Sequence, residues 1–491
     1  MGTLFRNGTV VTASDMVEAD VLVEGETIVT IGKSIPSRGH EVVNCKGKYL
    51  FPGGIDVHTH LDLPFGGTYS NDDFDVGHKA AAFGGTTMHI DFVNQPRGGT
   101  LHDGLKTWRE KAKPAQIDYG FHMIVSDLRE DVMEEIPSLL EEGITSIKLF
   151  MAYKNVFQID DKTLYRAMKQ AAANGMIVMV HAENGDVEEQ LRLQLLAEGK
   201  TDPHWHYHSR PPEIEGEATN RAVVLAGMTD CRLYVVHMTC EESIDALRRG
   251  RAQGYPVMGE TCVQYFHVTY EKHLRAPGFE GAKFVCSPPI RSVEDQAVLW
   301  QAVRDGTLQV VSTDHCDFWY EGGIGPWEQW AKDHNGGDWV EYEKQNPTYR
   351  RPGKELGKGN FAKIPNGLPG IEDRMIVMWH LGVNGGKISP SRFVELNCTN
   401  PAKIFGCYPR KGTIAVGADA DLVVWDPKKT HTISAKSHHM RCDYNLYEGM
   451  RVKGMPTQVY LRGRKVVDGD EWYGTNGGGK FIARKPYAAI L

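Results

Sequence analysis

The sequence predicts an α/β protein: a TIM-like (β/α)₈ barrel with a small β-sandwich domain formed by both chain ends. Three observations predict this fold. Eight short apolar runs alternate with helical stretches, strand-like runs occur at both chain ends, and 491 residues are too many for one small domain. Nearly continuous apolar strands that alternate with helices indicate a parallel sheet covered on both faces, and eight such units favour a closed barrel.

The chain ends carry short apolar runs broken by polar residues, Gly and Pro. Thr27–Ile31 near the start and Ala420–Trp425 and Gln458–Val467 near the end share this pattern. We therefore expect the two β regions to form one satellite domain that the barrel interrupts. The expected limits are residues 1–52 and 409–470 for the sandwich, 53–408 for the barrel and 471–491 for a C-terminal tail.

The eight expected barrel strands are short runs rich in β-branched residues. They are Gly54–His60, Thr86–Val93, Tyr119–Val125, Ser146–Tyr153, Met176–His181, Leu233–Thr239, Val257–Phe266 and Leu308–His315. Amphipathic stretches lie between several of them, at 128–142, 161–174, 240–253 and 293–305. Barrel enzymes place their active sites at the C-terminal ends of the strands, so polar residues at those ends are the candidates for function.

Two segments depart from this alternation. Residues 317–358 are expected to form a long loop after the eighth strand, with tryptophans at 319, 327, 330 and 339. So many tryptophans must pack, against the barrel mouth as a lid or, as we favour, against a neighbouring subunit. For the Gly-rich and then basic tail, disorder and docking both stay open.

The composition excludes several classes of protein. A formal net charge of -8 offers no basic field to nucleic acid or to anionic lipid. Nine scattered cysteines without a C-x-x-C pair argue against a disulfide framework or a zinc ribbon and indicate a reducing compartment. No signal peptide and no bilayer-spanning apolar run is recognisable, so the expected location is the cytoplasm.

Histidine and aspartate at strand ends suggest a metal centre. His58 and His60 alternate on one strand and so face the same side, although an H-x-H pair alone is a weak signal. His181, His237 and Asp314 lie at or near the ends of three other predicted strands. Any one of them is readily explained as a packed polar residue. Together, four imidazoles and a carboxylate suit zinc or a similar divalent ion.

Lys148 is unusual because it lies in the apolar run SIKLF, where an unpaired ammonium is costly to bury. An ammonium cannot ligate a cation. Reaction with CO₂ would convert it into an anionic carbamate, whose two oxygens can bridge two metal ions. The alternative is an ion pair between Lys148 and an aspartate that packs the barrel.

Other histidines are set aside. His204, His206 and His208 lie outside the predicted strands, so we expect surface histidines in a loop. His89 and His122 lie within predicted strands, where packed neutral histidines are common.

A series of segments along nearly the whole chain is specific for one family. They are GGIDVHTHLDLPFGGT, AAFGGTT, IKLFMAYKNVFQ, VHAENGD, SRPPEIEGEATNRA, VVHMT, GETC, CSPPIR, STDHC, IPNGLPGIEDR and KGTIAVGADADLVVWD. In these segments the chain resembles the dihydropyrimidinase/D-hydantoinase family, the cyclic amidohydrolase branch of the amidohydrolase superfamily.

The resemblance implies a site with two divalent metal ions, expected to be Zn²⁺. His58, His60 and Asp314 would hold the first ion, His181 and His237 the second, and a CO₂-derived carbamate on Lys148 would bridge them. The family's non-enzymatic neuronal relatives have lost metal ligands. This chain retains all six, which favours catalysis over a purely structural role.

The resemblance also implies the substrate contacts. Tyr153 would stabilise the oxyanion, and Ser287 and Asn366 would hold the amide and carbonyl groups through backbone contacts. From residue type alone these would be an aromatic at a barrel mouth and two polar loop residues. The apolar lining near the exocyclic substituent would be Leu63, Phe65 and Phe157, with Phe150 equally compatible with a core role. In the family His315 and Cys316 accompany the aspartate without being ligands, and Cys316 has no predicted base that would make it a nucleophile.

The implied reaction is hydrolytic ring opening. Dihydropyrimidines would give N-carbamoyl-β-amino acids, as in pyrimidine degradation, and 5-substituted hydantoins would give N-carbamoyl amino acids. A metal-bridging hydroxide would attack, with Asp314 as general base and then acid. The alternatives are an allantoinase, a dihydroorotase or a non-catalytic scaffold. A dihydroorotase needs an arginine near the metals, but HTHLD is followed by apolar LPFGG. The expected partners are a small cyclic amide and, by resemblance, further copies in a homotetramer.

Overall fold

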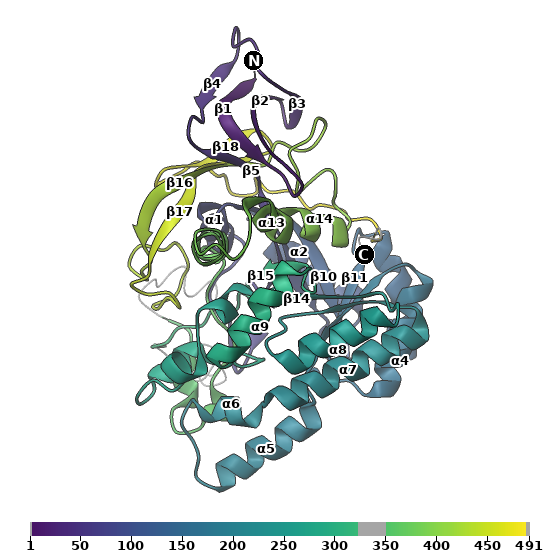
Figure 1. Cartoon of the computed structure of the whole chain (residues 1–491). Helices are drawn as coiled ribbons and strands as arrows, with labels where there is room; N and C mark the ends of the chain where they lie inside the picture. The colour runs from purple at the N-terminus through teal and green to yellow at the C-terminus, as the bar shows by residue number, and fades with distance from the viewer. Residues whose placement is uncertain (1, 323–349, 488–491) are drawn as a thin grey trace.

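The computed structural model describes residues 2–322 and 350–487. It consists of a barrel with its surrounding helices and, at one end of the barrel, a second layer of strands drawn from both ends of the chain (Figure 1). Trp327, Trp330 and Trp339 lie outside the described residues, so the expectation that they pack on a lid or a subunit contact stays a prediction.

The barrel contains the eight predicted strands, all parallel, in the order β15-β14-β13-β12-β11-β10-β9-β6. In chain order they are β6 (Gly54–Thr59), β9 (Thr86–Asn94), β10 (Asp118–Ile124), β11 (Ser146–Phe150), β12 (Ile177–His181), β13 (Arg232–Val235), β14 (Val257–Cys262) and β15 (Val310–Ser312). A bridge between Thr59 and His315 joins the two edges of this sheet, and the His60 N–H donates to the His315 carbonyl at 2.8 Å. The predicted closed barrel is confirmed.

Helices surround the barrel. They are α1 (Val76–Phe83), α2 (Leu101–Lys111), α3 (Glu130–Glu135), α4 (Asp161–Ala173), α5 (Gly185–Ala197), α6 (Trp205–Ser209), α7 (Pro212–Thr229), α8 (Glu241–Ala252), α9 (Val293–Arg304), α12 (Arg374–Met378), α13 (Pro390–Val394) and α14 (Asn400–Ile404). Capping boxes start two of them, Thr100 with Asp103 at α2 and Ser292 with Asp295 at α9. The predicted amphipathic stretch 128–142 is split into α3 and a 3₁₀ turn, because Pro137 has no N–H to continue the helix.

Short 3₁₀ and π turns connect these elements. They are η1 (Ile136–Leu140), η2 (Val263–Phe266), η3 (Tyr270–Leu274), η4 (Glu280–Phe284), η5 (Lys354–Gly357), η6 (Phe361–Lys363), η7 (Trp379–Val383) and η8 (Glu395–Thr399).

Strands from both chain ends form one nine-stranded sheet, in the order β19-β18-β17-β16-β5-β1-β2-β3 with β4 paired to β1. They are β1 (Thr3–Val11), β2 (Met16–Glu24), β3 (Thr27–Gly32), β4 (Glu41–Asn44), β5 (Tyr49–Pro52), β16 (Leu422–Thr432), β17 (Arg451–Leu461), β18 (Arg464–Asp468) and β19 (Glu471–Trp472). The antiparallel pair β5–β16 joins the N-terminal and C-terminal strands. Both chain ends therefore share one β layer, as predicted. A separate hairpin joins β7 (Pro64–Phe65) and β8 (Thr68–Tyr69).

The C-terminal tail docks at the base of the barrel. Phe481 bridges Tyr119, and the Ile482 N–H donates to the Tyr119 carbonyl at 2.7 Å. Arg484 is buried and donates to the Ser146 hydroxyl at 3.1 Å. Ile482 and Tyr487 join the apolar cluster that fills the barrel interior. Of the two possibilities left open by the sequence, docking is the one observed for residues up to 487.

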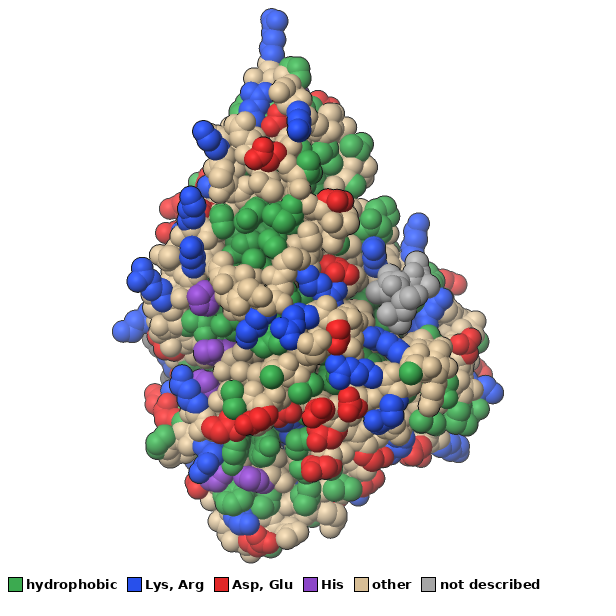
Figure 2. All heavy atoms as spheres, in the orientation of Figure 1, with side chains coloured by type: hydrophobic (Ala, Val, Ile, Leu, Met, Phe, Trp, Pro, Cys, Tyr) green, Lys and Arg blue, Asp and Glu red, His purple; other side chains and the backbone are tan. Residues whose placement is uncertain are grey.

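The surface carries mixed charge. Figure 2 shows acidic and basic side chains interspersed over the visible face. Among the described residues, no helix is both long enough and apolar enough to cross a membrane.

Candidate active site

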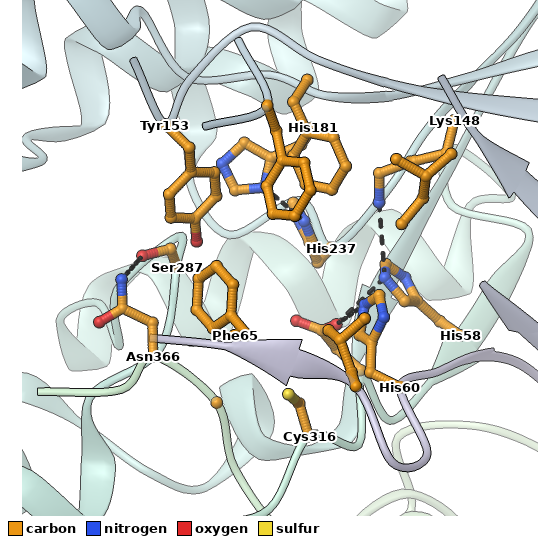
Figure 3. A pocket seen from close by; sticks show the side chains of 16 residues that line it. His58, His60, Phe65, Lys148, Tyr153, His181, His237, Ser287, Cys316 and Asn366 are labelled. Atoms are coloured by element: carbon orange, nitrogen blue, oxygen red, sulfur yellow. Dashed lines mark hydrogen bonds and ion pairs between the residues drawn. The ribbon is translucent and has the colours of Figure 1, made fainter. Parts of the chain in front are cut away.

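One pocket at the C-terminal ends of the barrel strands collects every candidate site residue (Figure 3). Its described lining is His58, His60, Leu63, Phe65, Ile124, Lys148, Phe150, Tyr153, Phe157, His181, His237, Ser287, Asp314, Cys316, Asn366 and Gly367. These side chains come from strands and loops that are far apart in sequence, and the closed barrel brings them together.

The first group of candidate ligands surrounds Asp314, which follows β15. Its Oδ1 lies 3.1 Å from Nε2 of His58 and 3.2 Å from Nε2 of His60. His58 lies on β6 and His60 directly follows it, so their rings reach the same carboxylate oxygen. One donor atom from each of His58, His237 and Asp314 lies within 4.8 Å of the others.

The second group is a pair of imidazoles. His181 ends β12 and His237 follows β13, and Nδ1 of His181 lies 2.9 Å from Nε2 of His237. Both side chains are buried. Burial lowers the pKa of each imidazole well below its usual value, so both rings are neutral and hold a lone pair, as metal ligation requires.

Two buried glutamates orient these histidines. Glu260, on β14, hydrogen-bonds Nδ1 of His58, and Glu183 Oε2 lies 2.7 Å from Nε2 of His181. A carboxylate only accepts, so each histidine donates from that nitrogen and its other nitrogen presents a lone pair to the pocket. Glu260 lies in the segment GETC and Glu183 in VHAENGD, and neither was predicted to have a role in the site. An acidic residue in an otherwise apolar strand was the signal for Glu260.

The charges suit a cation. Burial would raise the pKa of Asp314, but the neighbouring His58 and His60 hold it well below its usual value, so the carboxylate is ionised. Burial lowers the pKa of His60 to about 4. The neutral imidazoles of His60, His181 and His237 converge with His58 and the Asp314 carboxylate in a buried site. Imidazole and carboxylate groups are the donor set that divalent metal ions prefer.

Lys148 lies in the middle of β11 with 1% of its surface exposed. Its Nζ is 3.5 Å from Nε2 of His58 and 4.7 Å from the centre of the Phe92 ring. Among the described residues it forms no ion pair with a carboxylate, so the alternative of a packed lysine–aspartate pair is not observed. Burial lowers the pKa of Lys148 to about 8, which increases the fraction of free amine that can attack CO₂.

Three site residues have left-handed backbone conformations. The φ angles are 66° at Tyr153, 37° at His237 and 54° at Asp314. Non-glycine residues rarely adopt such angles, and each costs about 1–3 kcal/mol unless the surroundings impose it. All three side chains line the same pocket. The strained backbone conformations therefore occur where side chains are directed into the site.

Tyr153, Ser287 and Asn366 lie on the side of the pocket opposite His58 and Lys148 (Figure 3). Asn366 Nδ2 donates to the Ser287 hydroxyl at 3.1 Å, and the Tyr153 hydroxyl points toward Ser287. Burial raises the pKa of Tyr153, so the phenol stays protonated and can donate a hydrogen bond.

Aromatic rings form the apolar wall next to these polar groups. Phe65 meets Tyr153 edge-on with ring centres 5.5 Å apart, and Phe150 stacks on Phe157 at 5.0 Å. Phe150 belongs both to the barrel core and to the pocket lining, so it has the core role and the lining role that were expected as alternatives. Leu63 completes the wall and is buried.

The expectation for His206 was wrong. The segment with His204 and His208 was expected to be a surface loop, but Trp205–Ser209 forms the helix α6 and His206 is 3% exposed. Its Nε2 lies 2.7 Å from the Cys286 carbonyl and 3.4 Å from the Ser287 hydroxyl. His206 therefore supports the loop that carries Ser287. The pattern of three alternating histidines gave no sign of this packing.

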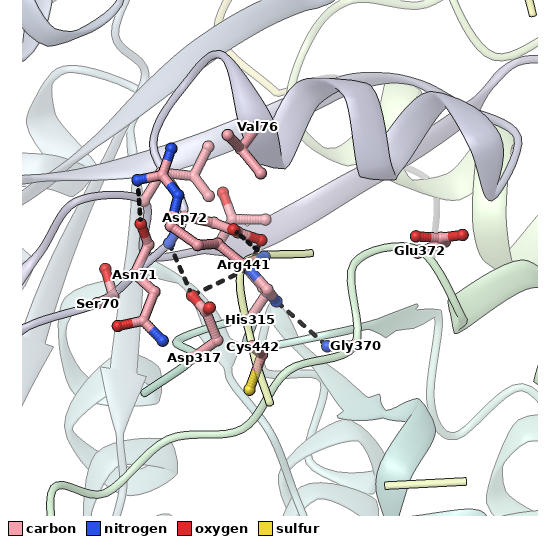
Figure 4. Close-up of polar contacts among 12 residues, drawn as sticks. Ser70, Asn71, Asp72, Val76, His315, Asp317, Gly370, Glu372, Arg441 and Cys442 are labelled. Carbon is pink, nitrogen blue, oxygen red and sulfur yellow. Dashed lines mark hydrogen bonds and ion pairs between the residues drawn. The ribbon is translucent and has the colours of Figure 1, made fainter. Parts of the chain in front are cut away.

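The residues next to Asp314 have other roles. His315 is not among the described lining residues of the pocket. Its Nε2 lies 3.2 Å from Asp72 and 3.4 Å from Asp317, and its Nδ1 accepts from the Gly370 N–H (Figure 4). Cys316 lines the pocket, but burial raises the pKa of its thiol well above the usual value, so it is not a thiolate nucleophile.

His89 and His122 are buried in β9 and β10, where burial lowers the pKa of each ring well below its usual value. The prediction that they are packed, neutral histidines is confirmed.

Comparisons with known proteins agree on one family. The model of the amidohydrolase family matches residues 49–466. The chain is 47% identical to a D-hydantoinase from Geobacillus stearothermophilus, over all of this chain and 98% of that protein. It is 38% identical to a dihydropyrimidinase from Rattus norvegicus, over 99% of this chain and 90% of that protein. The crystal structure of a dihydropyrimidinase from Brevibacillus agri NCHU1002 superimposes with a TM-score of 0.92 at 48% identity, over the full length of both chains.

Proposed function

The chain belongs to the amidohydrolase family, in its dihydropyrimidinase and D-hydantoinase branch, and we infer from this that it is a hydrolase that opens cyclic amides. The substrates we propose are 5,6-dihydropyrimidines, 5-substituted hydantoins, or both. The observation that carries this proposal is the single pocket in which four histidines and one aspartate, with Lys148 beside them, face an aromatic wall across the space for a small ring.

The lining of the pocket argues against the closest alternatives. The pocket that contains the candidate ligands has no arginine among its described lining residues. It therefore offers no partner for the extra carboxylate of dihydroorotate. Phe65, Phe150 and Phe157 instead offer an apolar surface to a ring substituent. Allantoin carries a polar ureido group in place of an apolar substituent, which this surface disfavours. A non-catalytic scaffold would have no need of the ligand set.

We propose that two divalent ions, Zn²⁺ in the first place, occupy the site. His58, His60 and Asp314 would hold one ion, and His181 and His237 the other. A carbamate formed from CO₂ on Lys148 would bridge them. Two observations support this proposal. The facing ring nitrogens of His181 and His237 repel each other unless a cation or a proton lies between them. Lys148 lies beside His58 without a carboxylate partner among the described residues.

The chain's own residues would then guide the proton and the substrate. Bound metal ions supply a water of lowered pKa and polarise the substrate carbonyl. Asp314 would take the proton of that water and hand it to the leaving ring nitrogen. Tyr153 would donate to the developing oxyanion, a contact typically worth about 3–4 kcal/mol. Backbone groups at Ser287 and Asn366 would fix the ring amide, and Leu63, Phe65 and Phe157 would contact the substituent.

The remaining expectations stay proposals. They are a cytoplasmic location, a homotetramer, the absence of nucleic-acid and membrane partners, and domain limits at residues 52, 408 and 470. Size measurement by light scattering tests the tetramer directly.

A substrate panel tests the function. Purified protein with Zn²⁺ and bicarbonate is assayed with dihydrouracil, hydantoin, 5-phenylhydantoin, allantoin and dihydroorotate, and the metal content is measured in parallel. We expect turnover of dihydrouracil or a hydantoin. Turnover of allantoin or dihydroorotate alone would replace this assignment, and bound metal without any turnover would favour the scaffold.

A further inference from the structure

Three loops line the pocket, and each comes from a different part of the chain. They are 61–70 with Leu63 and Phe65, 285–288 with Ser287, and 365–367 with Asn366. Apart from the short β7–β8 hairpin, these loops have no regular structure. In the part of the chain that the structure describes, one short segment, Arg351–Lys354, contacts all three.

Lys354 connects the loops of Ser287 and Asn366. The side chain is fully buried, and its Nζ donates to the carbonyls of Val285 at 2.9 Å, Pro365 at 2.7 Å and Gly367 at 2.8 Å. Three carbonyl acceptors match the three N–H bonds of an ammonium group. Val285 precedes Ser287 by two residues, and Pro365 and Gly367 flank Asn366, so one side chain fixes the spacing of the two loops.

The two loops also meet directly. The Gly367 N–H donates to the Val285 carbonyl at 3.1 Å, which is one of the carbonyls that Lys354 binds. A Cβ on Gly367 would lie 2.3 Å from the Cys316 carbonyl, so only glycine fits between the Asn366 loop and the strand end that carries Asp314. The hydrogen bonds of Lys354 therefore hold the Asn366 loop at a point where it is already packed tightly against Cys316.

Arg351 holds the third loop. The residue is 1% exposed, and its Nη1 donates to the Ser70 carbonyl at 2.8 Å and to Asp62 at 3.3 Å. The Ser70 hydroxyl donates to the His60 carbonyl at 2.6 Å and accepts from the Leu63 N–H at 2.8 Å. Arg351 is therefore linked through Ser70 to the start of the apolar wall.

Charge on these two basic side chains is costly to bury, and burial lowers the pKa of Lys354 to about 7. Among the described residues Lys354 forms no ion pair with a carboxylate, and an apolar side chain of the same length would avoid the loss of hydration. Its three backbone bonds compensate only if the carbonyls stay where they are. The free-energy cost of burying the charge is therefore offset only while the two loops keep their observed positions.

We propose that Arg351 and Lys354 are positioning residues for the substrate: Lys354 sets the spacing of the loops that hold the ring amide, and Arg351 sets the loop that contacts the ring substituent. This inference rests on the proposed hydrolysis of cyclic amides. Neither residue lines the inner pocket, so both act through the loops that they bind.

The test compares Lys354→Met and Arg351→Met with Lys358→Met, which removes an exposed lysine four residues after Lys354. For each variant we measure kcat and KM for hydantoin and 5-phenylhydantoin, the metal content and the melting temperature. Lys354→Met should lower kcat/KM about 10- to 100-fold for both substrates, because a displacement near 1 Å costs this much in a positioned reaction. Arg351→Met should raise KM for 5-phenylhydantoin at least about 5-fold more than for hydantoin. Metal content should stay at the wild-type value, and Lys358→Met should behave as the wild type.

Other results would overturn the inference. Wild-type kinetics in folded Lys354→Met, or equal effects of Arg351→Met on both substrates, contradict it. If Lys354→Met does not fold, Lys354→Gln, which retains two N–H donors, should fold and show a smaller loss of kcat/KM. Failure of both lysine variants to fold, or loss of metal in parallel with activity, would mean that the role is purely structural. A wild-type protein that turns over neither dihydrouracil nor a hydantoin instead contradicts the proposed function, which the substrate panel detects first. If dihydrouracil alone is turned over, dihydrouracil and a phenyl-substituted dihydrouracil replace the two hydantoins in this test.

Discussion

Glu260 and His58 form a buried hydrogen bond beneath the pocket, and the Tyr234 hydroxyl donates to the other oxygen of the same carboxylate at 2.9 Å. Neither Glu260 nor Tyr234 has an exposed surface. The pair fixes which nitrogen of His58 faces Asp314 and Lys148. Glu260 is therefore as much a determinant of the site as the residues that line it.

Glu260→Gln should weaken metal binding about 10- to 100-fold, the usual effect of removing a partner of a metal-ligating histidine. The amide retains the shape of the carboxylate but loses its charge and offers an N–H that competes for the same ring nitrogen. Competition with a chelator measures the affinity. Tyr234→Phe serves as the control, because it removes only the hydrogen bond from Tyr234 to Glu260. This variant should lose less metal affinity than Glu260→Gln. Equal affinity in Glu260→Gln and the wild type would rule out this role.

Lys148→Ala should lose both metal and activity, because the variant has no amine to form a carbamate. Short carboxylic acids should restore part of the activity by placing a carboxylate in the vacated space. Elemental analysis and assays with added acetate or propionate check this. Full metal occupancy and full activity without the lysine would exclude a bridging carbamate.

Asp314→Asn should lower kcat about 10²-fold or more, the scale of losing a general base. The amide fills the same space but cannot accept the proton of the attacking water. Steady-state kinetics at neutral pH, with the metal content measured alongside, separates this effect from metal loss. A variant that retains metal and wild-type kcat would remove Asp314 from the proton path.

Ile482→Ala should destabilise the barrel from its base. The side chain is 1% exposed and packs in the apolar cluster of the barrel interior, so its truncation should cost about 2–5 kcal/mol and lower the melting temperature. Lys480→Ala, at an exposed position two residues earlier, is the matched control and should melt near the wild type. Equal melting curves for the two variants would show that the tail does not stabilise the barrel.

Much of the barrel could be predicted from sequence, because strands buried on both faces leave a continuous apolar run. The ligands were visible for a related reason: His181, His237 and Asp314 are polar residues at or just beyond the ends of such runs. Their convergence follows from the parallel order of the strands.

Other features depend on contacts that no local pattern reveals. His206 is buried because α6 packs below the Ser287 loop, 81 residues away in sequence. Lys354 looks like any loop lysine until its three carbonyl partners are seen. The docking of Arg484 depends on Ser146, which is 338 residues distant. A single sequence reveals hydrophobic periodicity and turn residues. Contacts between residues far apart in the chain change neither of these patterns, so they cannot be predicted from them.

The docked tail has a consequence for synthesis. A ribosome releases the chain from its N-terminus, so β1–β5 emerge long before β16, the strand that pairs with β5. The base of the barrel is completed later still, since Ile482 and Tyr487 follow β16 in the chain. A nascent chain that already contains every residue of the pocket therefore still exposes one sheet edge and an open barrel floor. The barrel therefore cannot be completed before Tyr487 has been translated, and chaperones that shield unpaired strands should engage the chain until then.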